Sequence, residues 1–434
     1  MSMRSLAFFR KTIACAACCA WFLLGLACAG WAGISSAGMP AGPAGEELPQ
    51  FGGPGSVGGT LNRDSEAEPA VALERGPLDG WFAFKERLNR DHGFAFGLDY
   101  NALWQGASQS PGRNQAAGGA LRIFGQWTLL GRGSEDVGFL VYKVENRHRL
   151  GASIAPKALG FETGYTGLTA VPFSDIGWAL TNLYWDQRFL GNRLAFAVGV
   201  VDVTDYVDVY GLVDSWTAFS NLAFTTNPTI PAPNQGLGLA CRVLAANNIY
   251  LLGGMADANG DPSEPGDFFR SLVDEAEYFS HLEIGWVSSF ANRFSDNIHL
   301  TAWHVDQRQK AGTPSGWGLA FSISRLLAQR WEPFLRMGYA KDGGALWERS
   351  LSLGLGWHAR ERGDLIGVGL NWSRPSADTL GPGLGDQYTA EIFYRVQVLK
   401  LLTVTPGVQL LLDPAQNPEE DLIAILGVRA RVSF

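Results

Sequence analysis

Ten polar residues, several of them spaced two or four apart, form the candidate binding set of this chain. Arg122 and Gln126 are four residues apart, and Arg429 and Arg431 are two apart. Residues at even spacing share one face of an extended strand. A planar guanidinium can hold paired hydroxyls, while carboxylates and amides accept or donate single hydrogen bonds. The set is Asp99, Arg122, Gln126, Glu283, Arg336, Glu391, Arg395, Gln409, Arg429 and Arg431.

Alternating apolar and polar residues define the strands that would carry this set. Counted back from the final residue, every second position is apolar: Phe434, Val432, Ala430, Val428, Leu426, Ala424 and Leu422. A long strand with one wholly apolar face needs a permanent apolar neighbour. A transmembrane β-barrel provides one, because its outer face meets lipid while its inner face meets water. The pattern predicts that Arg429 and Arg431 point into a polar interior.

Similar runs recur along the chain and predict an all-β fold, a 16-stranded antiparallel transmembrane β-barrel. Each run is close to the length that a tilted strand needs to cross a bilayer. The runs are 94–105, 119–130, 137–147, 176–186, 194–203, 236–244, 248–257, 278–288, 296–306, 316–325, 331–340, 347–358, 364–373, 386–398, 401–412 and 421–434. Short and long connections alternate, which places the short turns on the periplasmic side. The connection 341–346 is the exception, because it is an outer loop no longer than a turn.

Residues 1–29 have the features of a signal peptide. Basic residues precede an apolar stretch that ends at Ala27-Cys28-Ala29, a cleavage site of the A-x-A form. A lipoprotein anchor on Cys28 is the alternative, and Gly25 speaks against it because an apolar residue is expected there. A signal followed by a barrel predicts the outer membrane of a Gram-negative-type bacterium.

Residues 30–76 are rich in Gly, Pro, Ala and Glu and lack periodicity, which predicts a disordered periplasmic leader. Trp81, Phe84 and Leu88 then recur at helical spacing, which predicts a short amphipathic helix over 77–92. The sequence therefore predicts three parts: the signal, the leader and a barrel domain over 77–434.

Composition excludes several classes of protein. The 34 Lys and Arg against 42 Asp and Glu give a formal net charge of −8, so nucleic acid is an unsuitable partner. Of the five cysteines, only Cys241 lies beyond the signal, so the mature chain can form no internal disulfide. No segment is long and apolar enough to predict a membrane-spanning helix.

Catalytic, metal and cofactor chemistry finds no support in the motifs. The six histidines are scattered, and His299 with His304 lacks metal-ligand context. The segment 257–261 is similar to the start of a calcium loop, but it lacks the glycine and the glutamate such loops require, which favours a plain turn. No nucleophile–histidine–acid set can be placed, so the sequence predicts no catalytic residue, no metal, no cofactor and no enzyme, although distant residues could converge.

From about Leu78 to Phe434 the chain resembles the OprB-like carbohydrate-selective porins. The most specific stretch is a series in the last three strands, formed by Glu391, Tyr394, Pro406, Gln409, Pro414, Gly427, Arg429 and Phe434. The opening motif departs from the family, with Phe82-Ala83 where glycines are usual. The resemblance implies a sixteen-stranded outer-membrane channel that passes monosaccharides and small oligosaccharides by facilitated diffusion. It also implies that the barrel-assembly machinery recognises Phe434.

Strand phase and the resemblance together suggest how such a channel would work. The ten candidate residues would line the lumen and contact carbohydrate solutes, or they would form ion pairs of the barrel wall without touching sugar. The long loops 148–175 and 204–235 would fold inward or stay on the surface. The first carries Arg147, Arg149, Lys157, Phe161 and Tyr165, and the second carries Asp205, Asp208, Tyr210, Asp214 and Trp216.

Three alternatives stay open beside a carbohydrate porin. Because arginines also suit anions, the first is a porin of broader or anionic-solute selectivity. The second is an outer-membrane enzyme of barrel form, and the third is a secreted soluble β-protein. The expected partners of the barrel are outer-membrane lipid and lipopolysaccharide, and the barrel would be a monomer or a homotrimer.

Overall fold

The structure is a computed structural model that describes residues 51–434 apart from 69, 71–77 and 361–362. The predicted signal peptide 1–29 and much of the predicted leader lie outside the described residues. Among the residues that are described, no helix has the length and apolar character to span a membrane.

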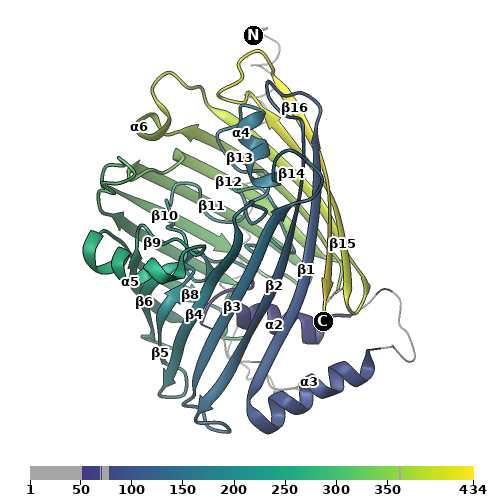
Figure 1. The fold of residues 1–434 in the computed structure, drawn as a ribbon, viewed down its shortest axis with the longest axis vertical. Coiled ribbons are helices and arrows are strands. Elements are labelled where there is room, and N and C mark those ends of the chain that lie inside the picture. Colours follow the sequence, from purple (N-terminus) through teal and green to yellow (C-terminus); the bar gives the residue numbers. More distant parts are fainter. Residues whose placement is uncertain (1–50, 69, 71–77, 361–362) are drawn as a thin grey trace. The chain divides into compact units, whose positions relative to one another are not determined.

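Sixteen strands form one closed antiparallel barrel (Figure 1), in which each strand pairs with its sequence neighbours and β1 pairs with β16. The strands are β1 (Phe94–Ala107), β2 (Gln115–Leu130), β3 (Gly138–Arg149), β4 (Gly177–Phe189), β5 (Leu194–Val201), β6 (Gly236–Leu244), β7 (Ile249–Asp257), β8 (Tyr278–Val287), β9 (Asn297–Val305), β10 (Gly316–Ser324), β11 (Trp331–Asp342), β12 (Trp347–His358), β13 (Leu365–Pro375), β14 (Gln387–Leu399), β15 (Leu402–Leu412) and β16 (Leu422–Ser433). The predicted strand count, order and fold class are confirmed. The largest difference is at β2, whose ladder with β1 extends to Gln115.

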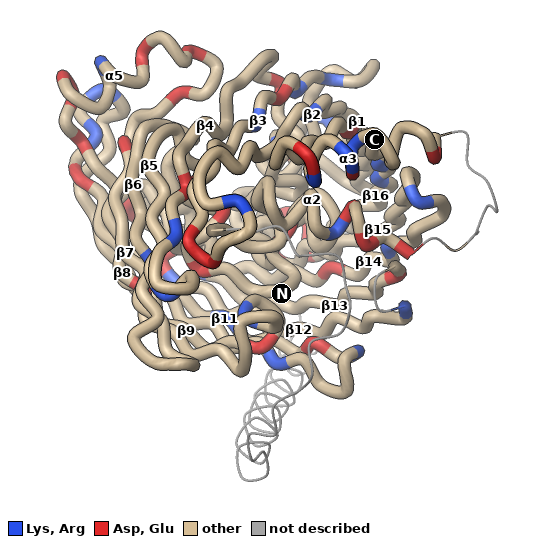
Figure 2. Tube along the Cα trace, turned by 90° about the horizontal axis from the view of Figure 1, so that it is seen from below, with Lys and Arg blue, Asp and Glu red and all other residues tan. Residues whose placement is uncertain are grey.

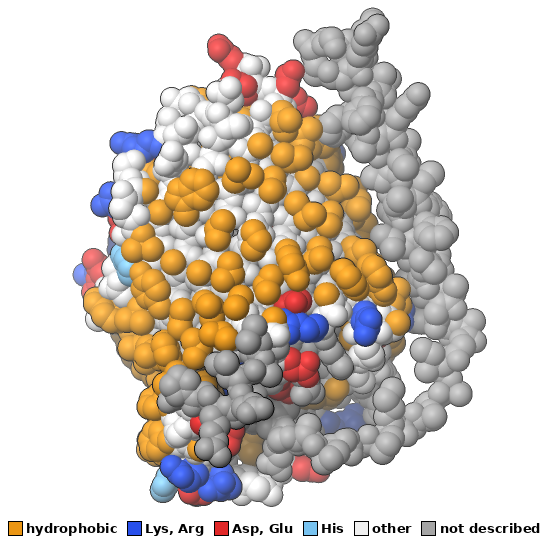
Figure 3. Space-filling view, turned by 90° about the vertical axis from the view of Figure 1, so that its right-hand side faces the viewer, with side chains coloured by type: hydrophobic (Ala, Val, Ile, Leu, Met, Phe, Trp, Pro, Cys, Tyr) orange, Lys and Arg blue, Asp and Glu red, His pale blue; other side chains and the backbone are white. Residues whose placement is uncertain are grey.

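Apolar side chains cover the outside of the strands. Leu282, Ile284, Leu426 and Val428 are exposed, whereas the residues between them along each strand face inward. Figure 3 shows such side chains spread over one outer face of the barrel. A soluble monomer rarely exposes so continuous an apolar surface, whereas lipid tolerates it at no cost. The period-2 pattern therefore has a direct physical reading, with lipid outside and a polar interior.

The two ends of the barrel differ. The turns 131–137, 190–193, 245–248, 288–296, 325–330, 359–364 and 400–401 form what we call the short-turn end. The opposite, long-loop end includes the connections 150–176 and 202–235. The connection 343–346 on that side is as short as the sequence predicts. Gly343 and Gly344 turn the chain there with φ of 72° and 79°, a conformation that suits glycine.

Helices lie at both ends and inside the barrel. The predicted helix over 77–92 is α3 (Asp79–His92), which ends at Gly93 with a left-handed φ of 69°. The others are α2 (Val57–Glu66), α4 (Pro156–Glu162), α5 (Phe268–Arg270) and α6 (Ala377–Leu380), with short turns η2 (Val203–Asp205), η3 (Pro265–Asp267) and η4 (Ser271–Glu275).

Helix α2 contradicts the prediction of a disordered leader over the part of 30–76 that the structure describes. Ser56 caps its first turn by accepting a hydrogen bond from the Gly59 N–H at 3.2 Å. Val57 and Leu61 are buried. Composition missed this segment because its order comes from contacts inside the barrel, which a local pattern does not encode.

Aromatic packing fills part of the lumen and holds the connection 202–235 inside it. The Phe219 ring lies 4.9 Å from the rings of both Phe224 and Phe393, and 5.8 Å from that of Phe334. Phe334 and Phe393 belong to β11 and β14, so the loop packs directly on the wall. The interior is thus less uniformly polar than a simple alternation of polar-in and apolar-out predicts.

Candidate functional site

The ten residues of the candidate set all lie on strands and face the interior. Nine are buried and Arg395 is half-buried. Their strand neighbours, such as Ile123, Ile392 and Val428, are exposed apolar side chains on the lipid face. Strand phase therefore placed the set on the correct side of the wall. By the contacts of their side chains, the ten residues divide into two groups and one isolated member.

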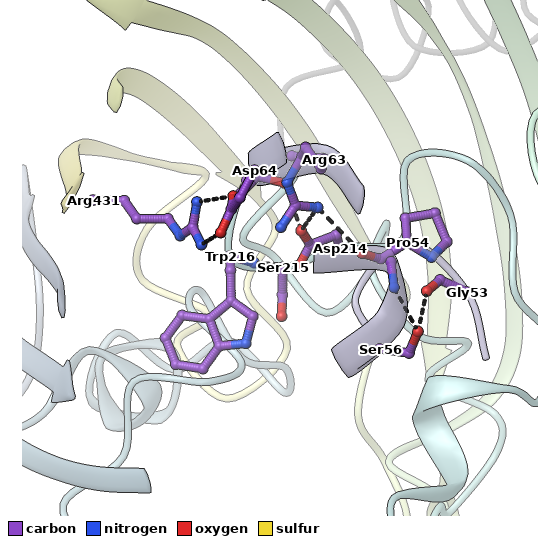
Figure 4. A network of polar contacts seen from close by, with 12 residues as sticks. Gly53, Pro54, Ser56, Arg63, Asp64, Asp214, Ser215, Trp216 and Arg431 are labelled. Carbon is purple, nitrogen blue, oxygen red and sulfur yellow. Dashed lines mark hydrogen bonds and ion pairs between the residues drawn. The ribbon is translucent and has the colours of Figure 1, made fainter. Parts of the chain in front are cut away.

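The first group is a charge network at the short-turn end. Asp99 of β1 accepts hydrogen bonds from Arg122 Nε at 2.8 Å and from Arg431 Nε at 2.8 Å. Arg431 also donates two hydrogen bonds of 2.7 Å to the carboxylate of Asp64 in α2 (Figure 4). Asp99, Arg122 and Arg431 are thus buried together with the half-buried Asp64, and their opposite charges offset the cost of desolvation.

The second group holds the connection 202–235 against the wall, and we call it the anchored wall. Its members are Glu283, Arg336, Glu391, Arg395, Gln409 and Arg429. Glu391 accepts hydrogen bonds from the backbone N–H groups of Ser220 at 2.9 Å and Asn221 at 3.0 Å. Arg429 donates to the carbonyl oxygens of Ser215 and Ala218, both at 2.7 Å.

The remaining anchors act in the same way. Arg336 donates to Asp208 Oδ2 at 2.5 Å and to the Thr225 carbonyl at 3.2 Å. Glu283 accepts from the Asp208 N–H at 2.9 Å. Gln409 accepts a hydrogen bond from Asn221 Nδ2 at 2.9 Å. Arg395 donates one to the Thr217 carbonyl at 3.4 Å. The side chains of these wall residues are directed at the loop's backbone and polar groups.

Gln126 is the isolated member. Its side chain is buried, and neither amide atom has a hydrogen-bond partner among the described residues. Gln126 therefore neither takes part in the charge network nor holds the inward loop through a hydrogen bond.

Both long connections fold inward, and they bind each other. The Val171 N–H donates to the Ser220 carbonyl at 3.2 Å, and the Leu222 N–H donates to the Leu168 carbonyl at 2.9 Å. Trp347 of β12 donates from Nε1 to the Thr166 carbonyl at 2.8 Å. The two loops thus form one body across the lumen, and an opening remains between this body and β3.

An open cavity of about 530 Å³ occupies that part of the lumen. One side is formed by Lys143, Glu145 and Arg147 of β3, which we call the open wall. The other side is formed by the connection 202–235, including Asp202, Thr204, Asp205, Asp214 and Trp216. Lys157 and other residues of 150–176 complete it toward the long-loop end.

The open wall carries paired charges. Arg147 Nη2 lies 2.5 Å from Glu145 Oε2, and Lys143 Nζ lies 3.8 Å from Glu145 Oε1. The guanidiniums of Arg122 and Arg147 lie 4.4 Å and 5.9 Å from the ring centre of Trp216. Charged hydrogen-bonding groups of both signs therefore line both sides of the cavity.

Two carboxyl groups of the loop that lines the cavity have very different pKa values. Burial and the negative charge of Asp202 raise the pKa of Asp205 to about 7, against the effect of Lys143. Burial alone would also raise the pKa of Asp214, but Arg63 of α2 and Thr217 outweigh it and lower the pKa to about 2. Asp205 therefore changes its charge near neutral pH while Asp214 stays ionised.

Sequence reasoning named Arg147, Lys157, Asp205, Asp214 and Trp216 as loop candidates but missed Lys143, Glu145 and Asp202. Lys143, Glu145 and Arg147 are spaced by two on β3, the same signal that identified Arg429 and Arg431. In the part of the chain that the structure describes, no group of three or more His, Cys, Asp or Glu side chains is arranged to hold a metal. The cavity thus offers charged hydrogen-bonding groups to a polar solute.

Known proteins share this architecture. Residues 288–434 match a family model described as carbohydrate-selective porin, OprB family. The high-pH structure of Pseudomonas putida OprB superposes with a TM-score of 0.66 at 15% sequence identity, covering 85% of this chain and 100% of that chain. Its low-pH structure gives a TM-score of 0.49 at 12% identity, covering 84% and 100%. A mutant of the Rh. blastica porin gives 0.47 at 13%, covering 79% and 100%. No curated protein sequence gave a significant match.

The structural superposition and the family match support different conclusions. At 15% identity the superposition on Pseudomonas putida OprB shows the sixteen-stranded porin fold. The family model bears on the last strands, where the series from Glu391 to Phe434 lies. Residues 288–434 match the carbohydrate-selective porin family, and the fold as a whole is that of a sixteen-stranded porin.

Proposed function

We propose that this chain is an outer-membrane channel for the facilitated diffusion of carbohydrates, chiefly monosaccharides and small oligosaccharides. The observation that carries the proposal is the open cavity between β3 and the inward loops, lined by charges of both signs. The match of residues 288–434 to a carbohydrate-selective porin family supports it. Solutes with many hydroxyls exchange hydration for such donors and acceptors, and weak binding lets them leave.

The charge of the cavity argues against strong anion selectivity. The charged residues that line the cavity are Lys143, Arg147, Lys157 and Arg308 on the basic side and Glu145, Asp202, Asp205, Asp214 and Asp261 on the acidic side. A lumen that favours anions would carry an excess of positive side chains. A porin of broader or anionic-solute selectivity is therefore only the second candidate. The many arginines of the wall support it.

Liposome swelling with the purified protein separates the candidates. The probes are glucose, a neutral polyol of similar size and gluconate, which adds one negative charge. A carbohydrate channel passes glucose fastest. Equal rates for glucose and the polyol would remove sugar selectivity, and faster entry of gluconate would favour the anion channel. No entry of any probe would contradict a channel altogether.

Direct contact with sugar is proposed first for Arg147 and Asp205, which line the cavity and are half-buried, whereas Glu145 is fully buried and would act through its charge. For the six anchors and for Asp99, Arg122 and Arg431, we propose an indirect role in shaping it. Gln126 does not line the cavity either. Swelling rates of variants at Glu145 and Glu391, compared at equal amounts of folded barrel, test this division.

The same proposal includes export and assembly. Residues 1–29 would act as the signal peptide, and the short-turn end would face the periplasm. At the end of β16, Phe434 donates from its N–H to the Leu98 carbonyl at 2.8 Å, which places it where the barrel closes. We propose that the assembly machinery recognises this residue, and that loss of Phe434 lowers the yield of folded barrel in the membrane.

The lipopolysaccharide leaflet would surround the long-loop end. Light scattering of the detergent-solubilised barrel distinguishes a monomer from a homotrimer.

A further inference from the structure

Residues 51–66 run through the barrel lumen. The Phe51 carbonyl accepts a hydrogen bond from Arg242 of β6 at 3.5 Å, while Asp64 accepts two from Arg431 of β16. Strands β6 and β16 are six steps apart around the sixteen-strand ring by way of β1. A segment bonded to both must cross the interior, and Figure 2 shows α2 within the ring of strands.

The same segment packs closely on the inward connection 202–235. The Gly53 N–H donates to the Asp205 carbonyl at 2.6 Å, and the Phe51 ring lies edge-on to that of Tyr206 at 5.5 Å. A Cβ on Gly52 would lie 2.6 Å from the Asp205 carbonyl oxygen. Side chains at the glycines would prevent this approach, so the Gly-Gly pair suits a docked segment better than a solvated leader.

Helix α2 separates two cavities. Gly55, just before it, lines the open cavity beside Asp214. Leu61 and Asp64, further along the helix, line a second cavity of about 130 Å³ with Phe82 and Phe434 at the short-turn end. The segment therefore lies across the path that a solute would take between the cavity and that end.

We propose that residues 51–66 are a plug that closes the channel from the short-turn end and must shift before solute can pass. The inference rests on the proposed channel function. It goes beyond that function because it assigns the segment a gating role.

Two ion pairs hold the plug, and the partners of both keep other polar contacts when the ion pairs open. Arg63 Nη1 lies 2.6 Å from Asp214 Oδ2, and Asp64 is held by Arg431 (Figure 4). After release, Arg431 would keep Asp99, and Asp214 would keep the Trp216 N–H and the Thr217 hydroxyl. Breaking a buried ion pair is most costly when a charge is left with no polar partner, so these remaining contacts lower the cost of a state in which the plug has shifted.

A disulfide can lock the plug. A Cβ built on Gly53 would lie 3.3 Å from Val209 Cβ, close to the Cβ separation in disulfides. The variant is G53C/V209C in a C241S background, so that Cys241, the one mature cysteine, does not compete. V209C/C241S is the matched control without a bridge, because it keeps Gly53, where a Cβ would lie 2.1 Å from Val209 Cγ1.

Glucose entry into liposomes is measured for each variant before and after reduction. We expect oxidised G53C/V209C to pass glucose at least several-fold more slowly than the reduced form, with no such change in the control. Equal rates in both redox states would overturn the plug and leave the channel proposal intact.

Loosening the plug should act in the opposite direction. R63Q/D64N removes both ion pairs, and R90Q alters an exposed arginine of α3 as the control. Entry several-fold above the unmodified barrel supports the plug, and an unchanged rate contradicts it. A barrel without residues 51–66 that folds, as judged by heat-modifiable migration, and still passes no sugar would contradict the channel function itself.

Discussion

The anchored wall and the open wall are built from the same kinds of residue, yet they serve different purposes. On β8, β11 and β14–β16, arginine, glutamate and glutamine side chains are directed at the inward loop, as in Arg429 with the Ser215 and Ala218 carbonyls. On β3, Lys143, Glu145 and Arg147 pair with one another and face the cavity. A polar residue on the inner wall is thus available to solute only where no loop covers it.

The largest effect is expected from breaking an anchor. In Arg336→Met, His299 is the one side-chain partner at 2.9 Å that Asp208 keeps among the residues described, and the Thr225 carbonyl loses the hydrogen bond from Arg336. Removing one partner of a buried ion pair typically costs about 3–5 kcal/mol. We expect the urea midpoint of the barrel, followed by tryptophan fluorescence, to fall, and sugar entry to lose selectivity as the loop loosens.

Arg349→Met is the matched control for Arg336→Met. Arg349 lies on β12, is half exposed and pairs with Glu348 at 3.2 Å, an exposed type of ion pair that contributes about 0–1 kcal/mol. If both variants lower the urea midpoint equally, the anchored wall does not depend on Arg336.

A change on the open wall should alter transport more than stability. Glu145→Gln keeps the shape of the side chain but removes the negative charge between Lys143 and Arg147, so the cavity becomes more positive. We expect the ratio of anion to cation permeability to rise several-fold in planar bilayers, because selectivity follows the charge that lines a pore. The destabilisation should be smaller than for Arg336→Met.

Glu391→Gln provides the contrast with Glu145→Gln. The same change in the anchored wall weakens the hydrogen bonds from the Ser220 and Asn221 N–H groups. We expect it to lower the urea midpoint while changing ion selectivity less than Glu145→Gln does. The reverse ranking would mean that our division of the wall is wrong.

The pH dependence of the open cavity should follow Asp205. Its pKa is raised to about 7, above the ordinary carboxyl value, so the folded loop favours the protonated form. This stabilisation is fully present below the ordinary pKa near 4 and is lost as pH rises through about 7. Above pH 7 the cavity gains a negative charge. We expect cation preference in planar bilayers to increase between pH 6 and 8, and Asp205→Asn to remove this step.

The sequence predicted the barrel in nearly full detail because lipid outside and water inside impose a strict period of two. The strand at 236–244 agrees with β6 at both ends. The same period placed all ten candidate residues on the inner face. It could not tell Glu391 from Glu145, because the difference lies in where the connection 202–235 folds, and that depends on contacts between segments far apart in the chain.

The plug is a second feature that could not be predicted from the local sequence pattern. Residues 51–66 have a glycine-rich composition that predicts disorder, and the helix that begins at Val57 is short. Its order depends on Arg431, Asp214 and Tyr206, which lie far away in the sequence. Neither composition nor local periodicity records such partners.

The smallest effect is expected at Gln126, which belongs to neither wall as defined by contacts. Its buried amide has no partner among the described residues, and it does not line the open cavity. Gln126→Leu removes two unsatisfied polar atoms and keeps a similar volume, so we expect the free energy of unfolding to change by less than about 1 kcal/mol. Sugar entry should stay at the unmodified rate. A large loss of either stability or entry would show that Gln126 acts through water in the lumen, and the cavity would then extend beyond β3 to β2.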